Sequence, residues 1–137
     1  MGACIFCRIV GGDAPAHVVC EDARTLVFMD IAPVSDGHTL IIPKAHSDDL
    51  FDADPEDLRA VVSQSHRVAA AIRRTLRPDG LGVYQLNGAA AGQTVFHYHM
   101  HLIPRQHGAP LGIHGRRPGD PERLAEVARS VARALEG

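Results

Sequence analysis

Phe96-His97-Tyr98-His99-Met100-His101-Leu102-Ile103 is the stretch of sequence that decides the fold, because it alternates three histidines with apolar residues. A β-strand sends successive side chains to opposite faces, so an extended segment places His97, His99 and His101 on one face. Neighbouring imidazoles then lie roughly 6 to 7 Å apart. The segment therefore predicts a strand that carries either a row of catalytic groups or a metal site.

The size and composition of the chain predict a single domain over residues 1–137. The chain has 137 residues, of which 45% are hydrophobic, and a formal net charge of -2. The charge and the lack of a long basic run argue against a nucleic-acid partner. The sequence lacks the long apolar stretch of a membrane span and the N-terminal pattern of a secretion signal. We therefore expect a cytoplasmic protein with no membrane partner.

Short runs of β-branched and apolar residues predict strands before and around the histidine segment. The stronger runs cover 25–29 and 39–42, and weaker ones cover 18–21 and 82–86. With the histidine strand they form an antiparallel, nearly sequential sheet of about five strands. The domain core is expected within about 4–106.

Two start signals predict helices. Asp54-Pro55-Glu56-Asp57 supplies an N-cap, a proline at the first helical position and acidic residues near the helix N-terminus. Asp120-Pro121-Glu122 repeats the signal and predicts a C-terminal helix over 120–136, after a Gly/Pro/Arg-rich loop over 107–119. The fold class is therefore α+β, with a long central helix and a C-terminal helix. The expected buried stripes are Leu58, Val61, Val62, Val68, Ala69, Ile72 and Leu76 in the first helix, and Leu124, Val127, Ala128, Val131 and Leu135 in the second.

Histidines in a row suit phosphoryl chemistry, since one imidazole can attack phosphorus while its neighbour protonates a leaving group. The preceding loop, 87–94, is small and glycine-containing and carries amide and hydroxyl donors, which makes it a plausible cradle for phosphate oxygens. Two other interpretations stay open from the residues alone. The three histidines could bind a catalytic zinc ion, or they could form a hydrogen-bonded structural row.

Several ordered blocks of the chain resemble the histidine triad (HIT) superfamily. They are Cys4–Val10, Phe28–Ile31, Gly37–His46, Gly92-Gln93-Thr94 and His97–Ile103, so that the likeness covers about residues 4–106. The N-terminal block and Gly37–His46 resemble the bacterial Hint-like branch more than the dinucleoside-polyphosphate hydrolase branch. The resemblance implies a HIT-like fold, a purine nucleotide substrate and a homodimer.

The resemblance also implies roles for individual residues. The implied enzyme is a hydrolase or transferase that cleaves nucleoside monophosphate conjugates of the purine nucleoside phosphoramidate type. His99 would form a covalent nucleotidyl intermediate, His101 would contact the phosphate and assist leaving-group protonation, and His38 would support the phosphate side. The implied nucleotide contacts are Asp30 to the ribose hydroxyls, Ile5, Phe6, Ile9, Phe28 and Ile31 around the base, and Asn87, Gln93 and Thr94 to phosphate oxygens.

The chain departs from the family pattern at two places. Thr94 stands where the family usually has serine, which keeps the hydroxyl and adds a stiffening methyl group. The chain has no tryptophan, whereas eukaryotic Hint proteins end in a tryptophan-bearing segment that reaches the partner's active site. The leaving-group preference therefore does not carry over.

Cys4 and Cys7 have the spacing of a metal knuckle, and a closed zinc site needs two more ligands. By resemblance to some bacterial members, His46 and His97 complete a structural zinc site. The alternatives are two reduced thiols on a short helix or a thioredoxin-like redox pair, since three cysteines with this spacing do not suggest a disulfide framework. The sequence assigns no task to Cys20, His17, His66, His107 or His114.

Three other functions remain as alternatives to the nucleotidyl-histidine enzyme. They are a dinucleoside polyphosphate hydrolase, a nucleotide-binding regulatory module with incidental turnover, and a zinc hydrolase.

Overall fold

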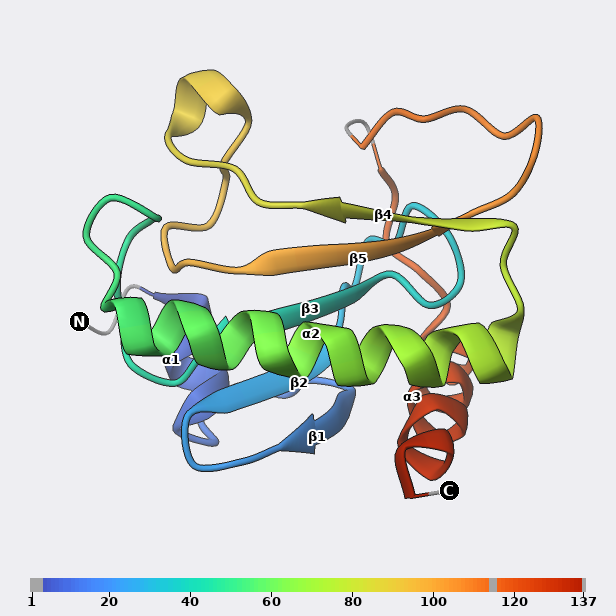
Figure 1. The fold of residues 1–137 in the computed structure, drawn as a ribbon, viewed down its shortest axis with the longest axis horizontal. Coiled ribbons are helices and arrows are strands. Elements are labelled where there is room, and N and C mark those ends of the chain that lie inside the picture. Colours follow the sequence, from blue (N-terminus) through green and yellow to red (C-terminus); the bar gives the residue numbers. More distant parts are fainter. Residues whose placement is uncertain (1–3, 114–115, 137) are drawn as a thin grey trace.

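The computed structural model describes residues 4–113 and 116–136, and its five strands form one antiparallel sheet. The strands are β1 (Val18–Glu21), β2 (Thr25–Met29), β3 (Thr39–Pro43), β4 (Gly80–Tyr84) and β5 (Met100–Arg105). The helices are α1 (Ile5–Val10), α2 (Pro55–Leu76) and α3 (Pro121–Glu136), with a short 3-10 turn at Ala89–Ala91. The spatial order of the strands is β1-β2-β3-β5-β4, so only the last two depart from sequence order (Figure 1). The predicted α+β class and near-sequential sheet are confirmed.

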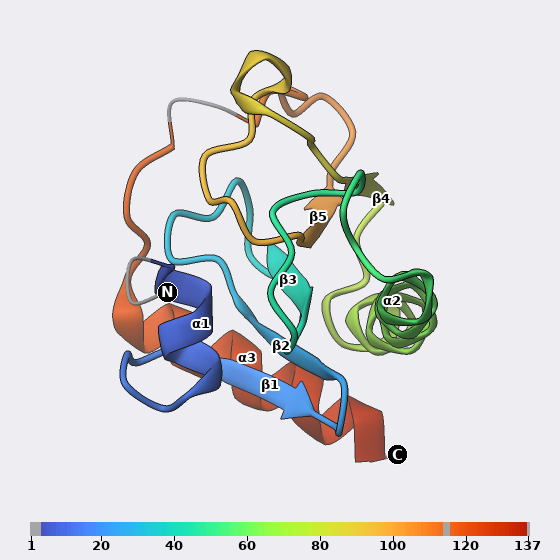
Figure 2. The same cartoon turned by 90° about the vertical axis from the view of Figure 1, so that its left-hand side faces the viewer.

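The sheet separates two hydrophobic clusters, which explains why β2 and β3 are buried throughout. Alternate residues such as Val27 and Ile41 join α2 and α3 in the larger cluster. Their neighbours Phe28 and Leu40 face the other way and pack with Phe6 of α1. Figure 2 shows α1 and α2 on opposite sides of the sheet. Leu40 pairs with His101 across the β3–β5 ladder, which places that histidine on the α1 face.

Both long helices begin where their capping signals predict. The Asp54 carboxylate accepts a hydrogen bond of 2.8 Å from the Glu56 amide, directly before α2. The expected buried stripe of α3 packs against the sheet and α2. None of the helices among residues 4–113 and 116–136 is long and apolar enough to cross a bilayer.

Val62 was wrongly predicted to be buried in α2. Its side chain is 55% exposed, whereas Gln64 and Ser65 turn inward. The inner face of α2 follows a spacing of three and four residues from Val61, and Val62 lies about 100° away around the helix axis. Ser65 satisfies its buried hydroxyl by donating to the Val61 carbonyl at 2.7 Å. The stripe therefore contains two polar residues that a hydrophobic pattern does not detect.

The histidine strand is shorter than predicted at its N-terminal end. β5 begins at Met100, so His97 and His99 lie on the irregular segment that leads into the strand. The Tyr98 amide there donates to the Ser47 carbonyl at 2.8 Å, which replaces a sheet partner with a loop partner. The alternation nevertheless survives, because Tyr98, Met100 and Leu102 pack into the α2 cluster. β4 also begins at residue 80 rather than 82, in register with β5 from Gly80–Arg105 onward.

Candidate functional site

Four histidines meet on the α1 face of the sheet. His38 lies directly before β3, His101 lies within β5, and His97 and His99 lie on the segment that precedes β5. All four side chains are buried. Because a buried imidazole must satisfy its polar atoms, the hydrogen-bond partners define which nitrogen of each ring carries the proton.

A relay of hydrogen bonds orients His101. The Val34 amide donates to Nδ1 of His38 at 3.0 Å, so that nitrogen carries no proton. Nε2 of His38 then donates to Nδ1 of His101 at 2.8 Å. In a neutral His101 the remaining proton must lie on Nε2. The relay therefore leaves His101 with an N–H group to donate.

The next histidine has the opposite tautomer. Nδ1 of His99 donates to the His97 carbonyl at 2.6 Å, so a neutral His99 keeps a lone pair on Nε2. The rings of His99 and His101 lie 4.9 Å apart between centroids. The rings of Phe6 and His99 also pack edge to face, with their centroids 5.1 Å apart. A nitrogen with a free lone pair and an N–H group therefore lie on adjacent rings, and displacement at phosphorus can use such a pair as nucleophile and proton donor.

Burial keeps these rings neutral. Loss of hydration lowers the pKa of His38 to about 4, although the nearby Asp30 carboxylate opposes this shift. Burial and the adjacent His99 and His38 lower the pKa of His101 to about 3. Burial also lowers the pKa of His99 and, together with its neighbour His46, that of His97. At neutral pH the site therefore holds uncharged imidazoles, with the tautomers derived above.

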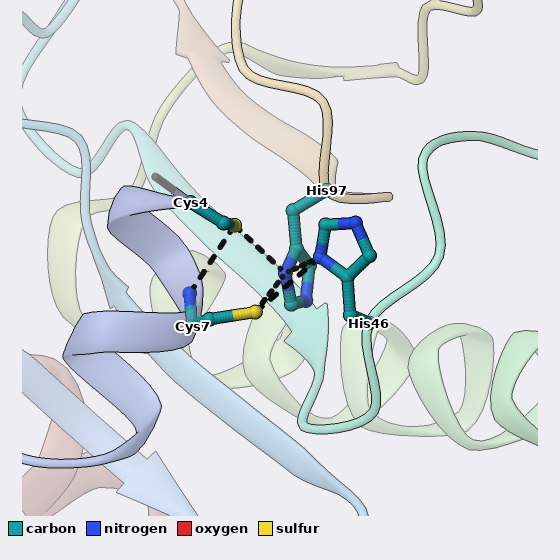
Figure 3. Close-up of side chains that lie close together, drawn as sticks. All are labelled: Cys4, Cys7, His46 and His97. Atoms are coloured by element: carbon teal, nitrogen blue, oxygen red, sulfur yellow. Dashed lines mark hydrogen bonds between the residues drawn. The ribbon is translucent and has the colours of Figure 1, made fainter. Parts of the chain in front are cut away.

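The predicted zinc ligands converge on one point from three separate segments (Figure 3). Nδ1 of His97 lies 3.5 Å from the Cys4 sulfur and 3.6 Å from the Cys7 sulfur. Nδ1 of His46 lies 3.3 Å from the Cys7 sulfur and 3.3 Å from Nδ1 of His97. Zinc bonds of about 2.0 to 2.3 Å in a tetrahedron place neighbouring ligand atoms roughly 3.3 to 3.8 Å apart. The four donor atoms thus have nearly the spacing that a tetrahedral zinc ion imposes.

The outer partners of both histidines also fit a metal site. Nε2 of His97 donates to the Pro43 carbonyl at 2.8 Å, and Nε2 of His46 donates to the Asp48 carboxylate at 3.0 Å. Each bond places the ring proton on Nε2 and leaves Nδ1 free to bind an ion, as metal-ligating histidines generally require. Two thiols and two imidazoles are a donor set that zinc prefers.

The geometry argues against the alternative in which the three triad histidines bind one zinc ion. Nδ1 of His97 faces the cysteines, whereas Nδ1 of His99 is bonded to a carbonyl and Nδ1 of His101 to His38. Ligand atoms of Asp30, His38 and His101 also lie within 4.8 Å of one another. The hydrogen bond between the two histidines already uses the nitrogens that an ion there would need.

In the proposed phosphate loop, residues 87–94, the side-chain amides of Asn87 and Gln93 are already hydrogen-bonded to other parts of the protein. The side-chain oxygen Oδ1 of Asn87 accepts from the Leu50 amide at 2.7 Å, and its Nδ2 atom donates to Oε1 of Gln85. Gln93 accepts from the Gly88 amide and donates to the Asp48 carbonyl, both at 2.6 Å. Thr94 is exposed instead. Phosphate contacts from Asn87 and Gln93 stay predictions, because both amides brace the loop in this structure.

A family model for the HIT domain matches residues 11–108 of this chain. The chain belongs to the HIT family. A Zn-bound histidine triad family protein from Mycobacterium smegmatis superposes with a TM-score of 0.88 at 43% identity, covering 98% of this chain and 94% of that chain. A hypothetical histidine triad nucleotide-binding protein from Sulfolobus tokodaii gives a TM-score of 0.89 at 31% identity, covering 97% of this chain and 92% of that chain. Adenylylsulfatase HINT3 of Arabidopsis thaliana is 40% identical over 75% of this chain and 52% of that protein.

The residues expected around the nucleoside lie along one side of the HIT domain. Phe6 and Phe28 form a buried edge-to-face pair with ring centroids 5.3 Å apart, and Ile9 packs against their cluster. Ile5 and Ile31 are exposed by 41% and 65%. Ile5 and Thr94 line the same hollow of about 410 Å³ beside the predicted zinc ligands Cys4 and His46. The two isoleucines are therefore open to a ligand, whereas the two phenylalanines are buried in the cluster on the α1 face.

Two residues at the site were missed by sequence reasoning. Arg116, from the loop after β5, donates to the Asp30 carboxylate at 2.7 Å and to the Ala32 carbonyl at 2.9 Å. A single arginine in a Gly/Pro-rich loop gives no periodic signal that would identify it. Asp48, the partner of His46, was detectable, because a carboxylate two residues from a metal-ligating histidine is a common outer-shell partner.

The remaining residues without an assigned task divide by burial. Cys20 and His17 are partly buried, and His66 and His107 are exposed. His114 lies outside the described residues.

Proposed function

We propose that this HIT protein cleaves nucleoside monophosphate conjugates of the purine phosphoramidate type through a nucleotide bound covalently to His99. The observation that carries the proposal is the hydrogen bond from Nδ1 of His99 to the His97 carbonyl, because it leaves the Nε2 lone pair free beside the N–H group of His101. Among residues 4–113 and 116–136, neither of these Nε2 atoms has a hydrogen-bond partner. Relatives described as nucleotide-binding and as an adenylylsulfatase support a nucleotide substrate.

The proposed reaction has two displacements. Nε2 of His99 forms a bond to phosphorus as the bond from phosphorus to the leaving nitrogen breaks, and Nε2–H of His101 gives its proton to that nitrogen. Water then attacks phosphorus, the bond to His99 breaks, and the vacated Nε2 of His101 takes a proton from the water. The products are a nucleoside monophosphate and an amine. His38 contributes by holding His101 in the required tautomer.

The nucleotide would lie across the α1 face. In the proposed complex, Ile5, Phe6, Ile9, Phe28 and Ile31 surround the base, Asp30 accepts the ribose hydroxyls, and Thr94 donates to phosphate. Asn87 and Gln93 shape the phosphate loop, and either would contact phosphate only by exchanging one of its present bonds.

The test is direct detection of the adduct. Rapid-quench mass spectrometry of the protein during turnover of adenosine 5'-phosphoramidate is expected to show one added AMP mass, absent from His99→Ala. His66→Ala is the matched control, because it removes an exposed histidine on α2. Full turnover by His99→Ala would refute the proposal. Tight AMP binding without an adduct would favour the regulatory module, and preference for dinucleoside polyphosphates in a substrate panel would favour that hydrolase class.

We also infer a structural zinc ion held by Cys4, Cys7, His46 and His97. Its role would be to cross-link α1, the segment after β3 and the segment before β5, since four protein ligands leave no position for a reacting water. The support is the near-tetrahedral spacing of the donor atoms and the two outer partners that free Nδ1. The Zn-bound relative adds to it.

The zinc inference is tested with a cysteine pair. Cys7→Ser is expected to lose the ion, measured by native mass spectrometry, and to lower the melting temperature, because structural zinc contributes folding free energy. Cys20→Ser is the matched control and is expected to retain one zinc ion per chain. If metal removal abolishes substrate turnover at once and leaves the melting temperature unchanged, the protein is instead a zinc hydrolase.

We further propose a homodimer formed through the sheet edge at β4. β4 lies at the end of the sheet, and Val83 on it is 55% exposed. An edge strand with an exposed apolar side chain is a ready surface for pairing about a two-fold axis. Light scattering after gel filtration is expected to give twice the chain mass, and Val83→Lys is expected to shift it toward the monomer. A monomeric parent protein would contradict the proposal.

We propose a cytoplasmic location, because Cys4 and Cys7 must stay reduced to bind zinc. Cell fractionation tests it, and recovery of the protein outside the cytoplasm with Cys4 and Cys7 oxidised would contradict it.

A further inference from the structure

The segment after β5 is fastened to the turn that carries Asp30. Nη1 of Arg116 bonds both the Asp30 carboxylate and the Ala32 carbonyl, and the Gly119 amide donates to the Ile31 carbonyl at 2.7 Å. Gly119 also packs so closely that an added Cβ would lie 2.9 Å from a Pro33 side-chain carbon. Arg116 and Gly119 lie beyond the HIT domain match, which ends at residue 108. A part of the chain outside that match therefore holds the turn from two points.

These contacts leave a defined part of the Asp30 carboxylate open. Oδ1 accepts from the Ala32 amide at 2.9 Å, and Oδ2 accepts from Arg116 at 2.7 Å. Nε2 of His38 lies 3.5 Å from Oδ2, but its proton is directed to His101. A carboxylate offers about four acceptor positions, two on each oxygen. Among the described residues, the two close N–H donors thus leave one position on each oxygen.

We propose that Arg116 is a specificity-determining positioning residue that presents Asp30 to a ribose and thereby selects ribonucleotides over 2'-deoxyribonucleotides. The inference rests on the proposed function, in which the nucleoside lies beside Asp30. The two hydroxyls of a ribose supply two donors for the two open acceptor positions. A 2'-deoxyribose supplies only one and leaves a largely buried acceptor unpaired, which is the kind of loss that polar sites use to reject a substrate.

Arg116 determines this selection through orientation. Its Nη1 atom bonds both the Asp30 carboxylate and the backbone of the same turn. Without Arg116, only the hydrogen bond from the Ala32 amide holds the carboxylate, which is then freer to rotate. The positive charge of Arg116 also offsets the negative charge of the Asp30 carboxylate near the incoming phosphate. This second effect acts equally on both sugars, so it cancels in the ratio of their rates.

The experiment compares kcat/KM for adenosine and 2'-deoxyadenosine 5'-phosphoramidates. The parent protein is expected to prefer the ribose form by about tenfold or more, the size of one lost hydrogen bond to a charged group. Arg116→Met is expected to lower that preference about tenfold, mainly through KM for the ribose form, and Arg116→Lys is expected to recover part of it. Gly119→Ala perturbs the same turn from the second point and is expected to act in the same direction.

Arg117→Met is the matched control, because it removes the same charge from the adjacent, exposed position and is expected to leave the ratio unchanged. An unchanged ratio in Arg116→Met would overturn the proposal, even if kcat/KM fell by the same factor for both sugars. If the parent protein turns over neither compound, the proposed function fails separately. Calorimetric binding of AMP and 2'-deoxy-AMP to the same variants then decides the role of Arg116.

Discussion

Acid is expected to destabilise this protein through His38 and His101, which are buried as neutral rings. Burial lowers the pKa of His38 to about 4 and that of His101 to about 3. The charged and titratable groups that face the pair are Asp30, which raises both values, and Arg116 and His99, which lower them. Arg105 also lowers the pKa of His38. In the unfolded chain both rings return to an ordinary value of about 6.5.

The sign and size of the effect follow from these values. Because the folded-state pKa values are depressed, the unfolded chain takes up protons first as the pH falls. The contribution of the pair is therefore fully present above about pH 6.5 and is lost between that pH and the folded values. At pH 5, with each unfolded pKa about 1.5 units above the solution pH, each ring removes about 2 kcal/mol from the free energy of unfolding. Together the two rings remove about 4 kcal/mol.

The assay is urea unfolding between pH 8 and pH 5 for the parent protein and His101→Gln. Glutamine can still accept the hydrogen bond from His38, so the variant removes one titrating ring and keeps the relay acceptor. The zinc ligands are common to both proteins, and their protonation cancels in the comparison. The variant is expected to lose about 2 kcal/mol less than the parent over this range. Parallel stability curves would refute the assignment of buried neutral imidazoles.

Four further substitutions test the packing of the domain by urea unfolding. Phe6→Ala is expected to cost about 3 to 5 kcal/mol, because the ring is buried in the α1 cluster, and a cost below 1 kcal/mol would contradict that packing. Gly37→Ala is expected to cost about 2 kcal/mol or more, since φ is +92° there and an added Cβ would lie 2.4 Å from a Leu76 methyl carbon; a neutral result would show that the turn before His38 relaxes freely. Val61→Ala is expected to cost about 2 kcal/mol and Val62→Ala less than about 0.5, and equal costs would contradict the orientation of α2.

The elements that were predicted well are those whose signals are local. Asp54 and Pro55 define the start of α2 within four residues of sequence, and Asp120 with Pro121 does the same for α3. The predicted start of β5 was wrong, because a hydrogen-bond partner distant in the sequence determines where the strand begins. The Ser47 carbonyl holds the Tyr98 amide, and Ser47 lies in a loop that no periodic pattern links to the histidine segment.

The candidate site shows the same division. Cys4, Cys7, His46 and His97 are brought together as the family resemblance implied, since their spacing within ordered blocks reflects a shared fold. The tautomers could not be predicted, because they depend on backbone carbonyls such as that of Pro43. Arg116 could not be predicted either, because its partner Asp30 is 86 positions away and the loop after β5 that carries Arg116 has no helical or strand pattern.

The proposed reaction uses only His99 and His101, and the contacts of His97 explain why the row contains a third histidine. Its Nε2 atom is fixed to the Pro43 carbonyl, its Nδ1 atom faces the two cysteines, and its carbonyl accepts the proton of His99 Nδ1. The ring therefore belongs to the proposed metal site while the backbone of the same residue sets the tautomer of the proposed nucleophile. If the proposed ion joins His97 to the α1 cysteines, a shift of α1 relative to the sheet would be transmitted to that carbonyl. In the proposed enzyme, the first histidine of the triad would thus connect the anchoring of α1 to the orientation of His99.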